Sequence, residues 1–197
     1  MIRGIVFDMD GTLVDSQLDF DAMRREMELP AGLPILEAVA RLPKLHAERC
    51  QVILDRHERE GHERATLLPG VSELLAELGS RAIRVAIATR NSRAITAATL
   101  DKLRLAFDFA LTRDDGPVKP DPWPVQHACE RWQLTAAHVA VIGDYKFDIE
   151  CGRAAGCQTV LLTHPHDAAT YTNDEQADLL LTSLAEYERL LAWLDRA

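Results

Sequence analysis

Short apolar runs rich in β-branched and aromatic residues recur along the chain and alternate with longer stretches of helical character. The first run, residues 2–7, ends in acidic residues and glycine, which is typical of a buried strand that stops at a functional loop. Strands and helices in alternation predict an α/β fold with a parallel sheet between two layers of helices. Further strands are expected at residues 85–88, 107–111, 139–142, 159–162 and 179–181, and helices at residues 71–78, 92–103, 124–132, 148–155 and 184–194.

Residues 17–68 break this alternation. The segment contains no strand-like run, but it has three helix-like stretches, and prolines stand near their boundaries. The stretches lie at residues 19–28, 34–41 and 44–60. We therefore expect a small helical cap at residues 17–68, inserted after the first strand into a core formed by residues 1–16 and 69–197.

Polar residues directly follow three of the predicted strands. Parallel sheets bind their ligands beyond the carboxyl ends of the strands, where connecting loops meet at one edge. The pattern predicts a single polar site assembled from distant parts of the chain. The residues expected there are Asp8, Asp10, Gly11 and Thr12 after the first strand, Thr89, Arg90 and Asn91 after the second, and Asp144 with Asp148 after the fourth.

The amino-acid composition disfavours some classes of binding partner. The 197 residues include 22 Lys and Arg against 31 Asp and Glu, a net charge of -9, which disfavours binding to nucleic acid or to an anionic membrane surface. Because no stretch is long and apolar enough to span a bilayer, we expect a cytoplasmic protein. The four cysteines are scattered and are expected to be reduced and mostly buried: Cys50, Cys129, Cys151 and Cys157.

Four short motifs occur in order on the expected elements. They are D-M-D-G-T at residues 8–12, Thr89 after an apolar strand, Lys119 in V-K-P-D-P, and G-D-Y-K-F-D at residues 143–148. Each motif alone is weak, but the four in this order are specific. On these residues the sequence resembles the haloacid dehalogenase-like hydrolase superfamily, most closely its phosphoglycolate phosphatase-like members. The resemblance implies a Rossmann-like three-layer αβα core with a reduced helical cap.

The resemblance also implies roles for the acidic residues. Asp8 would be the nucleophile that carries the phosphoryl group as an aspartyl-phosphate, and it would bind a metal ion. Asp10 would act as general acid and base through its side chain and offer its backbone carbonyl to the metal. Asp144 would be a further metal ligand, while Asp148 would accept hydrogen bonds from metal-bound water or from Lys119.

The remaining implied roles concern the phosphoryl group. Thr89 would hydrogen-bond a phosphoryl oxygen, and Lys119 would neutralise charge on that group while holding Asp8 in place. Arg90 and Asn91 are candidates for binding substrate or phosphate. The expected substrate is a small phosphorylated metabolite, and the protein is expected to be a monomer or a homodimer.

The balance of charges at this site predicts that it binds a divalent cation. Ionised Asp8, Asp144 and Asp148 contribute three negative charges beside a phosphate of about minus two, whereas Lys119 contributes one positive charge. Two carboxylates 4 Å apart repel by about 4 kcal/mol at an effective dielectric constant near 20. Oxygen ligands with retained water suit Mg²⁺, so we expect a magnesium-dependent phosphatase.

Other functions share part of this pattern. A phosphosugar mutase of the same superfamily would use the same residues, and a receiver-type signalling domain also surrounds a phospho-aspartate with acidic residues, Thr and Lys. The receiver acceptor, however, follows the third strand and not the first. A dehalogenase fits less well because Asp10 and metal dependence belong to the phosphotransfer branch, and a pseudoenzyme is disfavoured because every catalytic residue type is present.

Two details of the sequence stand apart from the main pattern. The family usually has a small hydroxyl residue after the Gly-Asp of the last motif, whereas this chain has Tyr145 and Lys146. His164 and His166 have a spacing seen in metal sites, but a solvated loop after a strand explains them better, since no nearby acidic or cysteine partner supports zinc.

Overall fold

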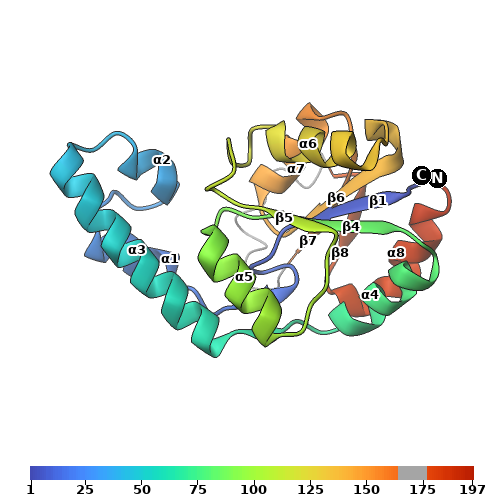
Figure 1. Cartoon of the computed structure of the whole chain (residues 1–197), viewed down its shortest axis with the longest axis horizontal. Coiled ribbons are helices and arrows are strands. Elements are labelled where there is room, and N and C mark those ends of the chain that lie inside the picture. The colour runs from blue at the N-terminus through green and yellow to red at the C-terminus, as the bar shows by residue number, and fades with distance from the viewer. Residues whose placement is uncertain (164–176) are drawn as a thin grey trace. The chain divides into compact units, whose positions relative to one another are not determined.

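The computed structural model describes residues 1–163 and 177–197 (Figure 1). His164 and His166 therefore lie outside the described residues. The chain divides into two compact units, which we call the core unit, Met1–Asp15 with Thr66–Ala197, and the cap unit, Ser16–Ala65. No described helix has the length and apolar character required to cross a membrane.

The core unit is built on a six-stranded sheet in the order β5-β4-β1-β6-β7-β8, and every neighbouring pair is parallel. This confirms the α/β class with a parallel sheet. Phe7 on β1 pairs with Ile87 on β4 and with Ile142 on β6, so the loops that follow these three strands leave the sheet at the same level. The strands are β1 (Gly4–Phe7), β4 (Arg84–Ala88), β5 (Phe109–Leu111), β6 (Val139–Gly143), β7 (Gln158–Leu162) and β8 (Leu179–Leu181).

Helices cover both faces of this sheet, as Figure 1 shows. On one face lie α6 (Trp123–Trp132) and α7 (Lys146–Ala154). On the other lie α4 (Val71–Ser80), α5 (Arg93–Lys102) and α8 (Tyr187–Leu194), the last preceded by the 3-10 turn η3 (Leu184–Glu186). The reversal of direction in the strand order at β1 places the later crossover helices on the opposite face, because βαβ crossovers are right-handed.

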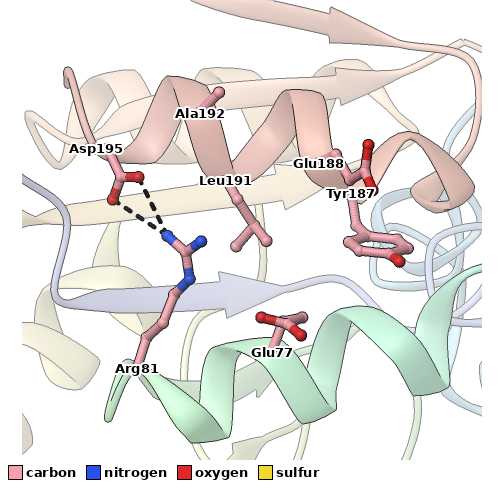
Figure 2. A pocket seen from close by; sticks show the side chains of 7 residues that line it. All are labelled: Glu77, Arg81, Tyr187, Glu188, Leu191, Ala192 and Asp195. Atoms are coloured by element: carbon pink, nitrogen blue, oxygen red, sulfur yellow. Dashed lines mark hydrogen bonds and ion pairs between the residues drawn. The ribbon is translucent and has the colours of Figure 1, made fainter.

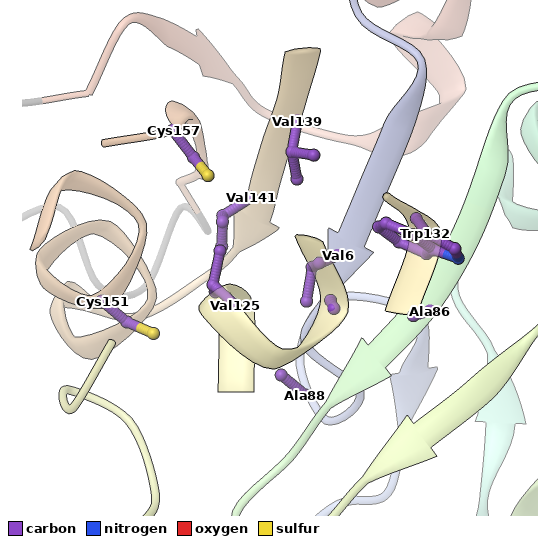
Figure 3. Close-up of a cluster of buried hydrophobic side chains, with 10 residues drawn as sticks. Val6, Ala86, Ala88, Val125, Trp132, Val139, Val141, Cys151 and Cys157 are labelled. Atoms are coloured by element: carbon purple, nitrogen blue, oxygen red, sulfur yellow. The ribbon is translucent and has the colours of Figure 1, made fainter. Parts of the chain in front are cut away.

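The face under α6 and α7 is packed with small and branched side chains (Figure 3). Alternate strand residues point to the same face, so Val6, Ala86 and Val141 meet one another beneath the helices. The indole of Trp132 lies over β1, where a Cβ atom on Gly4 would be 2.9 Å from the ring. Glycine and alanine on the strands thus make the room that the indole fills.

The cap unit has its own small core. Its helices are α1 (Phe20–Glu26), α2 (Ile35–Val39) and α3 (Lys44–Arg64). Met23, Met27, Cys50 and Leu54 form the buried cluster between them. The helical character expected for this segment comes from these apolar residues at helical spacing.

One sequence expectation was wrong. Residues 17–68 do contain a strand, because β3 (Thr66–Leu67) pairs antiparallel with β2 (Val14–Asp15). Two residues are too few to show a periodic pattern, and the pairing depends on a partner about fifty residues away. Helix and strand ends otherwise differ from expectation by a few residues. For example, α7 begins at Lys146 instead of 148, and β5 begins at Phe109 instead of 107.

Candidate active site

Asp8 stands at the end of the central strand. Its backbone N–H donates to the carbonyl oxygen of Ile142 at 2.9 Å, which continues the β1–β6 ladder by one residue. The chain then turns at Gly11, which has a φ of +79°, and the Gly11 N–H donates to the carbonyl oxygen of Val14 at 2.8 Å. This turn keeps the two aspartates, Asp8 and Asp10, at the carboxyl end of the sheet.

Lys119 ties Asp8 to the start of α7. Its ammonium donates to Oδ1 of Asp8 at 2.5 Å and to Oδ1 of Asp148 at 2.6 Å. The lysine side chain is 4% exposed and the Asp148 side chain 3% exposed, so the interactions are shielded from water. Residues 8, 119 and 148, which are far apart in the sequence, meet in one ion-pair network.

The protonation of the site reflects its burial and its excess of negative charge. The pKa of Asp8 is raised to about 7 as the net result of burial, which raises it most, of Lys119, which lowers it, and of Asp148 and Asp10, which raise it. Burial also raises the pKa of Asp144, with Asp8 and Asp148 adding to it. Burial alone would lower the pKa of Lys119, but its ion pairs with Asp148 and Asp8 raise it instead.

The carboxylates form a cluster with the chemistry of a metal site. One oxygen from each of Asp8, Asp144 and Asp148 lies within 4.8 Å of the other two. Gly11 lies against this cluster, since a Cβ atom there would be 2.1 Å from Oδ2 of Asp144. Three carboxylates beside one lysine leave uncompensated negative charge, and a hard divalent cation fits this set of donors.

Asn91 holds the side chain of Asp10. Its Nδ2 donates to Oδ2 of Asp10 at 2.6 Å, and its backbone N–H donates to the hydroxyl oxygen of Thr89 at 3.2 Å. Asn91 and Thr89 are both buried. Sequence reasoning treated Asn91 as a substrate ligand and missed its contact with Asp10, which no local pattern indicates.

The other residues expected to contact phosphate lie in the same region. Thr89 continues the sheet, because its N–H donates to the carbonyl oxygen of Leu111 at 2.9 Å. Arg90 donates from Nη1 to the backbone carbonyl oxygen of Lys119. The structure thus brings the eight candidate site residues to one edge of the core unit: Asp8, Asp10, Thr89, Arg90, Asn91, Lys119, Asp144 and Asp148. Direct binding of phosphate by Thr89, Arg90, Asn91 and Lys119 stays a prediction.

Tyr145 and Lys146 are accommodated at the start of α7. The Tyr145 N–H donates to Oδ2 of Asp148 at 3.0 Å, and the residue is 39% exposed. Close approach occurs at Gly143, where a Cβ atom would be 2.1 Å from Cγ of Asp148. The bulky residue therefore points its side chain outward, and the loop keeps its tight contact with Asp148 through glycine.

A concave region lies between α4 and α8, away from the acidic cluster's residues (Figure 2). At its edge Arg81 pairs with Asp195 at 3.2 Å. None of the eight candidate site residues lines it. The lining residues are Glu77, Arg81, Tyr187, Glu188, Leu191, Ala192 and Asp195.

Comparison with known proteins identifies the family. The family model of the haloacid dehalogenase-like hydrolases matches residues 5–162. The chain belongs to this family. The matched span begins in β1 and ends in β7, so it contains every residue of the acidic cluster together with Lys119.

Haloacid dehalogenase-like relatives match over nearly the whole chain. A haloacid dehalogenase-like hydrolase domain-containing protein of Arabidopsis thaliana is 32% identical, over 96% of this chain and 84% of the relative. A phosphoglycolate phosphatase of Nitrosococcus oceani is 29% identical, over 95% of this chain and 96% of the relative. A haloacid dehalogenase-like hydrolase from Streptococcus pneumoniae superposes with a TM-score of 0.74 at 25% identity, over 96% of this chain and 98% of that one. The chain is thus a haloacid dehalogenase-like hydrolase, and its curated relatives include phosphoglycolate phosphatases.

Proposed function

We propose that the chain is a magnesium-dependent phosphatase that hydrolyses small phosphomonoesters through an aspartyl-phosphate on Asp8. The observation that carries the proposal is the network in which Lys119 binds both Asp8 and Asp148 while Asp144 lies in the same acidic cluster. A carboxylate nucleophile must be kept ionised and oriented beside an anionic substrate. The buried ammonium of Lys119 orients Asp8 and lowers its pKa against the opposing effect of burial.

Mg²⁺ would be held by Asp8 and Asp144, with the Asp10 backbone carbonyl and the nearby Asp148 carboxylate completing the protein's contribution. When bound, the ion supplies positive charge that offsets the repulsion between these carboxylates and the phosphate. The three carboxylates, with ligand atoms within 4.8 Å of one another, support this assignment. Three negative charges against the single positive charge of Lys119 leave the cluster undercompensated.

The covalent step uses the first aspartate. One oxygen of Asp8 accepts the lysine hydrogen bond, and the other forms the bond to phosphorus as the ester P–O bond breaks. Lys119 and the hydroxyl of Thr89 donate hydrogen bonds to the phosphoryl oxygens and stabilise their charge in the transition state. Arg90 and Asn91 do not need to contact phosphate in this scheme.

Proton transfer belongs to Asp10. It protonates the leaving oxygen of the ester, and in the second step it takes a proton from the water that attacks the phosphorus and releases Asp8. The amide of Asn91 donates to Oδ2 of Asp10 at 2.6 Å and so orients the carboxyl group. Fixing the direction of the carboxyl group orients Asp10 for proton transfer to the leaving oxygen.

The substrate class is a small phosphorylated metabolite. The named relative from Nitrosococcus oceani is a phosphoglycolate phosphatase, which makes phosphoglycolate and small sugar phosphates the first compounds to assay. A screen of phosphorylated metabolites with Mg²⁺, ranked by kcat/KM, would identify the preferred one.

The test of the proposal is the substitution Asp8→Asn. We expect the purified variant to lose p-nitrophenyl phosphate hydrolysis by roughly a thousandfold or more, because the neutral amide is not a nucleophile. Asp101→Asn, on the exposed side of α5, is the matched control and should keep full activity. EDTA should abolish turnover and excess Mg²⁺ should restore it.

Three results would contradict the proposal. Retained activity in Asp8→Asn would remove the assigned nucleophile. Conversion of a phosphosugar to its isomer without stoichiometric phosphate release would show a mutase. A stable phospho-aspartate in the wild-type protein with negligible turnover would indicate a signalling receiver.

A further inference from the structure

Arg90 lies where three segments of the active site meet. Its Nη1 donates a hydrogen bond to the backbone carbonyl oxygen of Lys119, and its guanidinium lies over the ring of Phe147, 5.1 Å from the centroid. Arg90 belongs to the loop after β4, Lys119 to the loop before α6, and Phe147 to α7. One side chain therefore joins three segments that are distant in sequence.

These contacts matter because of what the lysine must do. The Lys119 ammonium makes short contacts of 2.5 Å to Asp8 and 2.6 Å to Asp148, so a small shift would break one of them. Lysine has a flexible four-carbon stem, and its burial leaves the position of its backbone to decide where the ammonium lies. A fixed backbone at Lys119 is thus a condition for the ion-pair network.

We propose that Arg90 is a positioning residue for this reaction, whose guanidinium holds the backbone of Lys119 against α7 and thereby keeps the ammonium between Asp8 and Asp148. The inference rests on the proposed phosphatase function. It differs from the sequence-based expectation, in which Arg90 binds substrate phosphate directly.

The chemistry of arginine suits this task. A planar guanidinium stacks on an aromatic face and donates hydrogen bonds at its edge at the same time, whereas a lysine ammonium is a point charge without a plane. The backbone of Arg90 is held as well, because Nη1 of Arg113 donates to the Arg90 carbonyl oxygen at 3.2 Å. Both ends of the residue are therefore anchored within the core unit.

The kinetic test compares Arg90→Met and Arg90→Lys with wild type. Methionine keeps apolar packing on Phe147 but loses the hydrogen bond, and we expect kcat to fall by about tenfold to a hundredfold, as displacement of a catalytic group by about 1 Å does. The KM for p-nitrophenyl phosphate should change by less than about threefold, because the substitution weakens stabilisation of the transition state and not binding of the substrate. Arg90→Lys should not restore kcat, since lysine lacks the planar fork.

The matched control is Arg131→Met. Arg131 also lies over an aromatic ring, 4.0 Å from the centroid of Phe109, and it is exposed on α6. It offers the same cation–π chemistry without a contact to Lys119 in the structure, and its loss should leave kcat and KM at the wild-type values. Thermal unfolding of all variants measures any general loss of stability.

A second measurement does not depend on catalysis. Lys119 is 3% exposed, so acetic anhydride should acetylate it slowly in the wild-type protein. Peptide mass spectrometry of folded Arg90→Met should find Lys119 acetylated at least about tenfold faster if opening of its loop governs the rate. Arg131→Met should label at the wild-type rate.

The outcomes separate the two proposals. If the wild-type protein hydrolyses no phosphomonoester, the proposed function fails, while faster Lys119 labelling in Arg90→Met would still show that Arg90 holds the lysine. If the wild type is active and Arg90→Met matches it in kcat and in labelling, the positioning role is wrong. A large rise in KM with kcat unchanged, rescued by Arg90→Lys, would instead assign Arg90 to substrate binding.

Discussion

At the scale of single residues, Gly11 shows how closely backbone and carboxylate approach in this site. Its φ of +79° is one that residues with a side chain rarely adopt, and its missing Cβ would lie 2.1 Å from Oδ2 of Asp144. The glycine therefore serves two needs at once, the turn after Asp10 and the space for a carboxylate of the acidic cluster.

We expect Gly11→Ala to weaken Mg²⁺ activation by about tenfold or more, because the new methyl group displaces the carboxylate of Asp144, a proposed metal ligand. Even the loss of a group that only orients a ligand costs about 10- to 100-fold in affinity. The Mg²⁺ concentration for half-maximal activity is the measurement. Gly32→Ala is the control, because Gly32 also has a positive φ, of +74°, but a Cβ atom there meets nothing within 4 Å. It should lose about 1 kcal/mol of stability and no Mg²⁺ activation. Equal Mg²⁺ activation in the two variants would contradict the steric argument.

At the scale of elements, α6 connects the fold to the site. It begins four residues after Lys119, and its other end is Trp132, whose ring covers β1 at Gly4 and lies 5.3 Å from Phe109. The indole Nε1 donates to Oδ2 of Asp108 at 2.8 Å. Packing of this one side chain thus fixes α6 on the strand that leads to Asp8.

We expect Trp132→Ala to destabilise the core unit by about 3–5 kcal/mol, since it leaves a large cavity over β1. Trp132→Phe keeps most of the packing but leaves Asp108 without the indole donor, and should cost about 1–2 kcal/mol. Urea denaturation followed by far-UV circular dichroism measures both. The half-buried Trp193 on α8 provides a comparison, because Trp193→Phe should cost less than Trp132→Phe. The reverse order would contradict the assigned role of the indole.

At the scale of the whole molecule, stability and metal binding are linked through the acidic cluster. The chain carries a net charge of -9, and burial raises the pKa values of two carboxyl groups of the cluster, those of Asp144 and of Asp8, the latter to about 7. In the unfolded chain Asp8 has the model-peptide pKa of 3.8, so between these two values the unfolded state binds fewer protons than the folded state. Folding of the metal-free protein therefore becomes less favourable as the pH rises through this window.

We expect the melting temperature in EDTA to fall between about pH 5 and pH 8, with most of the loss complete above the folded-state pKa of Asp8. Mg²⁺ should raise the melting temperature more at pH 8 than at pH 5, because protons compete with the ion for the same carboxylates. Asp8→Asn in EDTA should show a weaker pH dependence than wild type. A melting temperature in EDTA that rises across this range would contradict the raised pKa values.

Local sequence patterns determined the architecture of the core and the identity of its chemical groups. The alternation of apolar runs and helical stretches is a local property that a single segment displays by itself, and it predicted each strand of the parallel sheet to within about two residues. The motifs at Asp8, Thr89, Lys119 and Asp144 could be recognised in the sequence for the same reason, since each consists of a few adjacent residues.

Tertiary structure alone decided which groups touch and how they titrate. The bond from Asn91 to Asp10 spans 81 residues, that from Lys119 to Asp8 spans 111, and that from Arg90 to the Lys119 carbonyl spans 29. The pKa of Asp8 depends on burial, which no neighbour in sequence reports. The two-residue strand β3 likewise exists only through its pairing with β2. Contacts between distant residues form only in the folded chain, whereas the tendency of a segment to form a helix or a strand depends on its own side chains.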